Sequence, residues 1–196
     1  REKVLVIGAG PAGLEAAHIL GKRGHEVMLA DAAREFGGRV NWESRLPGLQ
    51  EWARVRDYRL TQLAKLSNVS LFRESRMSAD DAAATGVDHL IIATGSRWRR
   101  DGRGRNSAVP VPIADSGLLG VEDVMAGAAI HGPIVVYDED HYYVASALAE
   151  RLAKEGHQVA YVTDAGIVSA WSTYTAEQPR VQRRLFECGV ALYFNA

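Results

Sequence analysis

A cluster of glycines directly after a short apolar run constrains the fold of this chain most. Residues 4–7 are apolar and lead into Gly8-Ala9-Gly10-Pro11-Ala12-Gly13, after which the sequence has helical character. A second apolar run at residues 27–30 then ends at Asp31. Strand, glycine-rich turn, helix and a second strand with a terminal acid make a βαβ unit, and its first turn carries the dinucleotide-binding fingerprint.

Each residue of this fingerprint has its own physical task. Gly8 permits a tight turn, Gly10 lets a pyrophosphate approach the backbone, and Gly13 allows the helix to pack closely on the strand. The phosphates then meet unpaired N–H groups at the positive end of the helix dipole. Asp31 would accept hydrogen bonds from ribose hydroxyls, and its charge disfavours a 2′-phosphate. A glycine-rich turn that binds nothing is the alternative.

Composition narrows the class of protein. The chain has 196 residues, of which 47% are hydrophobic and 24% charged, as in ordinary globular proteins. Its net charge of −1 gives no electrostatic reason to bind nucleic acid or an anionic membrane. The sequence contains neither a membrane span nor a signal peptide, so a cytoplasmic location is expected. The arginines between residues 97 and 105 alternate with aspartate and glycine, which favours a solvated loop over a binding patch.

Cys188 is the only cysteine, which excludes an intrachain disulfide and a cysteine-ligated iron–sulfur cluster within these residues. It follows an amphipathic segment, which predicts a buried structural thiol rather than a nucleophile. The histidines do not stand at motif spacing from a nucleophile, so no catalytic residue is expected in this chain. The apolar run at residues 190–194 indicates a piece of a longer polypeptide.

The alternation of strands and helices continues up to residue 95. The pattern predicts a helix at residues 49–66, a strand at 69–72, a short helix after Ser78 and a strand at 88–95. The last strand has no polar face and is expected to be fully buried. Such alternation predicts an α/β fold with a parallel sheet. Because ligands bind at the carboxyl ends of such strands, Thr94 and Gly95 are expected near the glycine turn.

A change of composition between residues 97 and 112 predicts a domain boundary, with one domain at residues 1–112 and another at 113–196. The second domain contains its own βαβ unit, with a strand from residue 133, a helix at 145–154 and a strand at 157–163 that ends at Asp164. Gly-His-Glu-Val at residues 24–27 parallels Gly-His-Gln-Val at 156–159. We interpret the second unit as a partial internal duplication of the first.

The second unit lacks the glycines of the first. Its turn reads Asp138-Glu139-Asp140-His141-Tyr142-Tyr143. Three carboxylates would repel a pyrophosphate, and the side chains fill space that the phosphate needs. We therefore expect a degenerate unit that does not bind NAD(P)H. A metal site formed by Asp138, Asp140 and His141 is a disfavoured alternative, since such acids also serve at helix termini.

Longer motifs resemble one family of flavoproteins. They are DYRLTQLAKL (57–66), RMSADDAAATG (76–86), LIIATGSRW (90–98) and YDEDHYYVASALAE (137–150). These segments resemble the C-terminal half of the trimethylamine, dimethylamine and histamine dehydrogenases. The resemblance covers essentially the whole chain, and it implies two Rossmann-like domains of the FAD/NAD(P)-binding type.

The resemblance also implies a function. It implies an iron–sulfur flavoprotein that oxidises an amine and passes electrons to an electron-transferring flavoprotein, with FMN and a 4Fe-4S cluster in a preceding part of a homodimeric enzyme. In that family the counterpart of this chain binds ADP, a remnant of FAD, and its second unit is a degenerate NAD(P)H domain. The implied ADP contacts are Gly8, Gly10, Pro11, Ala12, Gly13 and Asp31, with Gly38 and Arg39 near the phosphates.

Two other functions stay open. The 2,4-dienoyl-CoA reductases share the two-domain arrangement, with FAD in the first unit and NADPH in the second. The acidic second turn disfavours this function, although Asp31 alone does not separate ADP from FAD, since both present the same adenosine end. The other is an interaction module, in which aromatic and basic residues of the helix at 49–66 dock an electron-accepting partner. These residues are Trp52, Arg54, Arg56, Tyr58 and Arg59, and ordinary helix packing with a solvated basic face is the favoured interpretation.

Overall fold

The computed structural model describes residues 1–101, 103–105 and 118–196. The chain divides into two compact units, and each is described by itself. The first comprises Arg1–Arg45 and Leu49–Ser96, and the second comprises Leu46–Gly48 and Arg97–Ala196. The predicted domain boundary after Pro112 falls outside the described residues and stays a prediction.

The first unit is built on a four-stranded parallel sheet. Its strands are β1 (Lys3–Ile7), β2 (Glu26–Ala30), β3 (Val69–Phe72) and β4 (His89–Ile92), in the order β3-β2-β1-β4. Every pairing is parallel, with Val6 opposite both Leu29 and Ile91. The predicted α/β architecture with a parallel sheet is thereby confirmed for this unit. The order also places the turn after β1 at the centre of the carboxyl edge.

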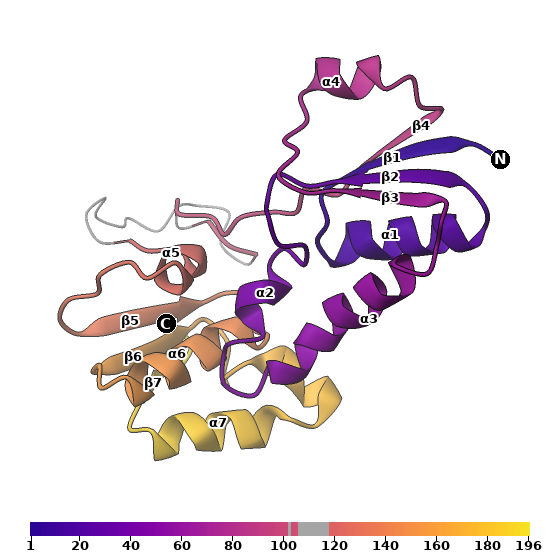
Figure 1. Ribbon diagram of the computed structural model, residues 1–196. Coiled ribbons are helices and arrows are strands. Elements are labelled where there is room, and N and C mark those ends of the chain that lie inside the picture. Colours follow the sequence, from indigo (N-terminus) through magenta and orange to yellow (C-terminus); the bar gives the residue numbers. More distant parts are fainter. Residues whose placement is uncertain (102, 106–117) are drawn as a thin grey trace. The chain divides into compact units, whose positions relative to one another are not determined.

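Helices cover the two faces of this sheet unequally. On one face lie α1 (Pro11–Lys22) and α3 (Ala53–Leu63), and the other face carries α4 (Ala79–Ala84) (Figure 1). The turn Gln50–Trp52 and the short helix α2 (Val40–Glu43) precede α3. The buried core joins Val4, Val6, Val27 and Leu29 of the sheet to Leu14 and Ala17 of α1 and Leu63 of α3. This core fixes the N-terminus of α1 against the end of β1.

The strand that was expected to be fully buried is in fact exposed. Leu90 is 46% and Ile92 is 72% exposed, so that prediction is wrong for β4. The physical reason is its position, because in the described part of the chain β4 lies at the edge of the sheet and pairs with β1 alone. Only Ile91, on the face that α1 and α3 cover, packs against the core. An unbroken apolar run indicates a strand here but not how deeply that strand is buried.

The second unit repeats the βαβ pattern with a smaller sheet. It contains β5 (Ile134–Asp138), β6 (Val159–Thr163) and β7 (Ala191–Tyr193), all parallel and in the order β5-β6-β7. Its helices are α5 (Val121–Met125), α6 (Val144–Lys154) and α7 (Gln178–Glu187), and a 3-10 segment spans Ala170–Thr175. Helix α6 packs on β5 and β6, and α7 packs on α6 (Figure 1). The predicted second βαβ unit is present.

Cys188 follows the last residue of α7 and is a free, half-buried thiol. The prediction of a buried thiol is therefore wrong, because Leu185 and Val181 occupy the buried face of that helix. No helix in the described part of the chain is long and apolar enough to cross a membrane.

Candidate nucleotide-binding site

The first turn joins β1 to α1 so tightly that side chains are excluded at two of its glycines. Gly8 has φ +101°, and a Cβ built on it would lie 2.3 Å from the carbonyl oxygen of Ala93. A Cβ on Gly13 would lie 1.8 Å from the carbonyl oxygen of Gly8. Gly8 therefore permits the turn after β1 to pass close to the end of β4. Gly13 permits α1 to begin directly beside Gly8.

Gly10 differs from these two glycines because a Cβ would fit there without a clash. Its φ of −74° suits any residue, and a Cβ there would approach only the Cα of Gly38, at 4.0 Å. Among the described residues, the N–H groups of Gly10, Ala12 and Gly13 have no hydrogen-bond partner. Pro11 is the first residue of α1 and has no N–H to leave unpaired. Unpaired donors at a helix N-terminus fit a phosphate group.

A second glycine pair lies against this turn, as the position of Gly38 in the sequence suggested. The N–H of Gly37 donates to the carbonyl oxygen of Ala9 at 2.8 Å. Gly38 has φ +56°, and a Cβ on it would lie 3.0 Å from the Cα of Gly10. Two glycine segments 28 residues apart thus approach each other through bare backbone, with no side chain of either glycine between them.

Asp31 stands at the end of β2 and reaches the same turn. Its Oδ2 accepts the N–H of Ala9 at 2.6 Å, and its Oδ1 accepts the N–H of Ala33 at 2.7 Å. Each carboxylate oxygen has further acceptor capacity, so ribose hydroxyls can still donate to it. The carboxylate thus both holds the turn in place and presents a negative charge where a 2′-phosphate would have to lie.

The structure brings most of the predicted residues together, but Arg39 stands apart from them. The Cα of Thr94 would lie 2.9 Å from a Cβ on Gly8, and Thr94 and the following Gly95 are exposed. Arg39 instead pairs with the buried carboxylate of Glu43, with Nη2 and Oε1 2.7 Å apart. Its guanidinium therefore already compensates a buried charge.

The turn of the second unit is filled by its own side chains. Asp138 is buried, and its Oδ1 accepts the N–H groups of Asp140 at 3.1 Å and His141 at 3.0 Å. Its Oδ2 accepts the hydroxyl proton of buried Tyr161. Burial raises the pKa of the Asp138 carboxyl, against the hydrogen bond from Tyr161, which lowers it. A carboxyl group of the chain thus binds backbone amides at the turn that corresponds to the glycine turn of the first unit.

His141 blocks the second unit further. It is buried, adopts φ +60°, and its Nε2 lies 2.6 Å from Oδ1 of Asp164. Asp164 follows β6 as Asp31 follows β2, so an imidazole contacts the acid that corresponds to the ribose acceptor. In the described residues no three His, Cys, Asp or Glu side chains converge to hold a metal ion. Asp138 and His141 turn instead toward Tyr161 and Asp164, which disfavours the alternative of a metal site.

Sequence reasoning missed four residues that shape these two turns: Asn41, Arg56, Tyr161 and Ser169. Asn41 and Arg56 border Gly37, and Ser169 donates its N–H to the Tyr161 hydroxyl at 3.3 Å. The only signal for Tyr161 is a hydroxyl-bearing residue on the buried side of a strand. For Asn41 the signal is an amide side chain shortly after a glycine pair, a common way to cap such turns.

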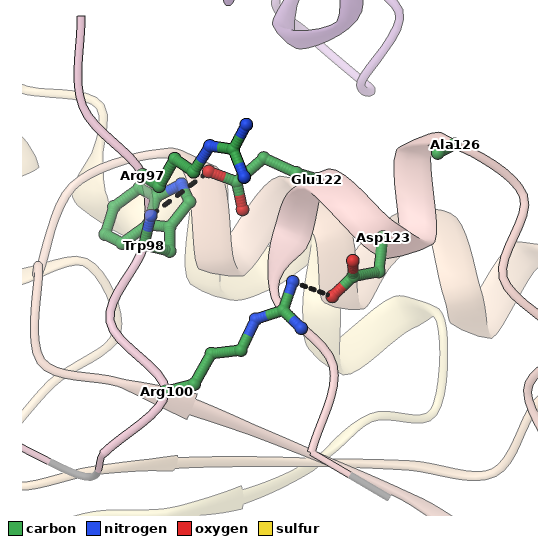
Figure 2. A pocket seen from close by; sticks show the side chains of 6 residues that line it. All are labelled: Arg97, Trp98, Arg100, Glu122, Asp123 and Ala126. Atoms are coloured by element: carbon green, nitrogen blue, oxygen red, sulfur yellow. Dashed lines mark hydrogen bonds and ion pairs between the residues drawn. The ribbon is translucent and has the colours of Figure 1, made fainter.

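A separate cavity of about 470 Å³ lies in the second unit, beside α5 (Figure 2). Nη2 of Arg100 lies 2.5 Å from Oδ2 of Asp123, and the backbone N–H of Trp98 donates to Glu122 at 3.1 Å. Arg99 of the same arginine run pairs with Asp101, whose pKa is lowered to about 2 by that hydrogen bond. Exposed arginines with acidic partners agree with a solvated loop, and we assign no ligand to the cavity.

Two parallel α/β units, the first with an open glycine turn, define a protein with a Rossmann-like FAD/NAD(P)-binding fold. The chain belongs to the pyridine nucleotide-disulphide oxidoreductase family, whose model matches residues 2–105. Residues 119–195 match a second model, the OYE-like second alpha/beta domain. The boundaries of these two matches agree with a division of the chain into two units.

Several oxidoreductases are similar in sequence or structure to this chain. Dimethylamine dehydrogenase of Hyphomicrobium sp. (strain x) is 39% identical over 95% of this chain, which covers 26% of that protein. The structure of histamine dehydrogenase from Rhizobium sp. 4-9 is 45% identical with a TM-score of 0.95, over 99% of this chain and 30% of its own. That of 6-hydroxypseudooxynicotine amine oxidase from Pseudomonas geniculata N1 is 46% identical with a TM-score of 0.95, over 99% and 29%.

These similarities confirm the resemblance to the dimethylamine and histamine dehydrogenases. The chain corresponds to the nucleotide-binding part of such flavoproteins, and it spans about a quarter to a third of the length of these relatives. The activity, substrates and partners of a complete protein are therefore matters for proposal.

Proposed function

We propose that the first unit binds ADP as a structural nucleotide in an amine-oxidising iron–sulfur flavoprotein. The observation that carries the proposal is the pair of N–H groups on Ala12 and Gly13, which are unpaired within the described chain at the N-terminus of α1. The turn would hold the pyrophosphate and Asp31 would hold the ribose. The FMN and 4Fe-4S cluster of the complete protein would lie outside these residues and would supply the redox chemistry.

In this proposal ADP stabilises the fold rather than reacting. A ligand that binds only the native state adds about 2.7 kcal/mol of stability at a hundredfold excess over its Kd. Asp31, with Oδ2 2.6 Å from the Ala9 nitrogen, links the ribose end of the site to the turn that would hold the phosphates. Bound nucleotide would therefore tie the ends of β1 and β2 together.

Identification of the native nucleotide tests the proposal. The full-length protein is purified without added nucleotide and denatured, and the released small molecules are separated by chromatography. We expect ADP in an amount close to one equivalent per chain. Recovery of FAD or of NADPH in place of ADP would reject the assignment of ADP.

A reductase with FAD in the first unit and NADPH in the second is the second candidate, because residues 2–105 match the pyridine nucleotide-disulphide oxidoreductase model. The turn at Asp138 disfavours it, since a carboxyl group already accepts the amides of Asp140 and His141. Anaerobic addition of NADPH distinguishes the two candidates. We expect the flavin absorbance to stay constant, whereas bleaching by NADPH would favour the reductase.

We further propose an electron-transferring flavoprotein as the acceptor of the complete homodimeric enzyme, docked in part on α3. Arg54 is the basic residue best placed for this, because its side chain is 81% exposed and pairs only with exposed Glu51 in the described structure. Arg59, by contrast, binds Glu15 of α1 at 2.7 Å. Charge reversal by Arg54→Glu is expected to slow electron transfer several-fold, with a steeper effect at low salt. An unchanged rate would remove this docking surface.

A further inference from the structure

The glycine pair that faces the first turn is held in a backbone conformation that needs external support. Gly37 has φ +127° and Gly38 has φ +56°. Gly37 is buried, whereas Gly38 is exposed to solvent and lies against the backbone of Gly10. Glycine samples many backbone conformations, and this one persists only where neighbouring groups select it.

Asn41 supplies one such neighbour. Its Nδ2 donates to the carbonyl oxygen of Phe36 at 3.1 Å, and a Cβ on Gly37 would lie 2.1 Å from its Oδ1. The amide thus spans the glycine pair from behind, from the residue before Gly37 to the start of α2. It restrains the peptide group between Phe36 and Gly37.

Arg56 of α3 holds Asn41 in turn. Its Nη1 donates to Asn41 Oδ1 at 2.9 Å, and its Nε donates to Asp57 Oδ1 at 2.7 Å. The arginine is also close to the glycine pair itself, since its Cδ would lie 2.7 Å from a Cβ on Gly37. The side chain of Arg56 is 26% exposed, unlike that of Arg54, so it belongs to the packing behind the site rather than to the solvated face.

We propose that Asn41 and Arg56 are positioning residues for the pyrophosphate, holding Gly37 and Gly38 in place opposite Gly10. This inference rests on the proposed function, nucleotide binding by the first turn. It assigns to α3 a role in affinity for a nucleoside diphosphate, although neither side chain is placed at the phosphates. The adenosine end is held separately, by Asp31, and does not depend on this pair.

The test compares ADP with adenosine, since only ADP carries the pyrophosphate. Affinities for both are measured on the full-length protein by displacement of radiolabelled ADP. In Asn41→Ala and Arg56→Ala, two lost hydrogen bonds are expected to weaken ADP binding about tenfold. Adenosine binding is expected to stay within about twofold of the wild type. The ratio of the two affinities is the readout, because a general loss of stability would lower both.

Two control variants complete the design. Arg54→Ala removes an exposed arginine of α3 that pairs with Glu51, and Arg59→Ala removes an arginine that binds Glu15 of α1. Both are expected to keep the wild-type ratio. If Asn41→Ala does not fold, Arg56→Ala alone decides. A wild-type ratio in a folded Arg56→Ala or Asn41→Ala protein overturns the inference, whereas a wild-type protein that binds no ADP rejects the proposed function instead.

Discussion

The two βαβ turns share a backbone plan but differ in what lies at the end of the first strand. After β1 the chain offers bare backbone, with the N–H groups of Ala12 and Gly13 unpaired within the described residues. After β5, the buried carboxyl group of Asp138 accepts the amides of the turn itself. The first turn therefore leaves donors available to a ligand or to water, whereas the second satisfies the amides of Asp140 and His141 internally.

The acids at the ends of β2 and β6 show the same contrast. Asp31 keeps the first turn open by accepting the N–H of Ala9, whereas Asp164 contacts buried His141 from the turn. Under the proposed function, one substitution pattern converts a ligand site into a closed structural element without loss of the sheet or the helix. Under the same proposal, the side chains at the phosphate and ribose positions separate a binding unit from a structural one.

The largest effect is expected where the first turn tolerates no side chain. In Gly13→Ala the new Cβ would lie 1.8 Å from the Gly8 carbonyl oxygen, a backbone atom that moves only with the strand. We expect the first unit to lose at least about 3 kcal/mol of stability, and ADP binding with it. Hydrogen exchange of the β1 and β2 amides measures this locally, and wild-type protection in the variant would contradict the geometry of the turn.

Gly10→Ala is the matched substitution that separates binding from stability. Its Cβ would meet nothing closer than 4.0 Å and Gly10 has an ordinary φ, so protection of β1 and β2 should change by less than about 0.5 kcal/mol. The methyl group would occupy the space proposed for the pyrophosphate, so ADP binding should fall at least about tenfold. Unchanged ADP affinity in equilibrium titration would place the phosphates elsewhere.

The closed turn is tested next by removal of one hydroxyl group. Tyr161→Phe leaves buried Asp138 without its side-chain donor, at an expected cost of about 1 to 3 kcal/mol in the second unit. Tyr137→Phe is the control, because Tyr137 is 42% exposed and donates an exposed hydrogen bond of 2.9 Å to Glu139. It should cost less than about 0.5 kcal/mol. Equal losses of unfolding free energy in the two variants, measured by denaturant unfolding, would mean that the buried Asp138 carboxyl does not depend on the Tyr161 hydroxyl.

The smallest expected effect is a pH dependence. Burial raises the pKa of Asp138 above its ordinary value of 3.8, so the folded protein binds this proton more tightly than the unfolded chain. Stability from this group is therefore complete below pH 3.8 and falls as the pH rises toward the folded pKa, by about 1.4 kcal/mol for each pH unit between the two values. Asp138→Asn should lack this decline. A difference in unfolding free energy between wild type and variant that is constant from pH 4 to 7 would contradict this pH dependence.

The sequence predicts the first turn well because each of its glycines answers a local need of the backbone. Gly8 is required by its φ of +101°, Gly13 by the carbonyl oxygen of Gly8, and Asp31 by the length of the βαβ unit. The sequence also predicts that side chains fill the turn at Asp138, because the residues there are large and acidic.

Other features depend on contacts between distant residues and could not be predicted in this way. The contacts Asn41–Arg56 and Asp138–Tyr161 join residues 15 and 23 positions apart, from different elements. The exposure of Ile92 follows from the position of β4 at the sheet edge, which apolar content does not encode. For Arg39 the sequence shows a cation after two glycines but not its buried partner, Glu43.

The number of nucleotides bound per chain of the full-length protein tests whether the first turn is open and the second is closed. Wild-type protein and Gly10→Val are each dialysed against labelled ADP and, separately, against labelled NADPH. We expect one ADP per chain in the wild type, none in the variant, and no NADPH in either. NADPH bound by both proteins, or ADP bound equally by both, would contradict this division of roles between the two units.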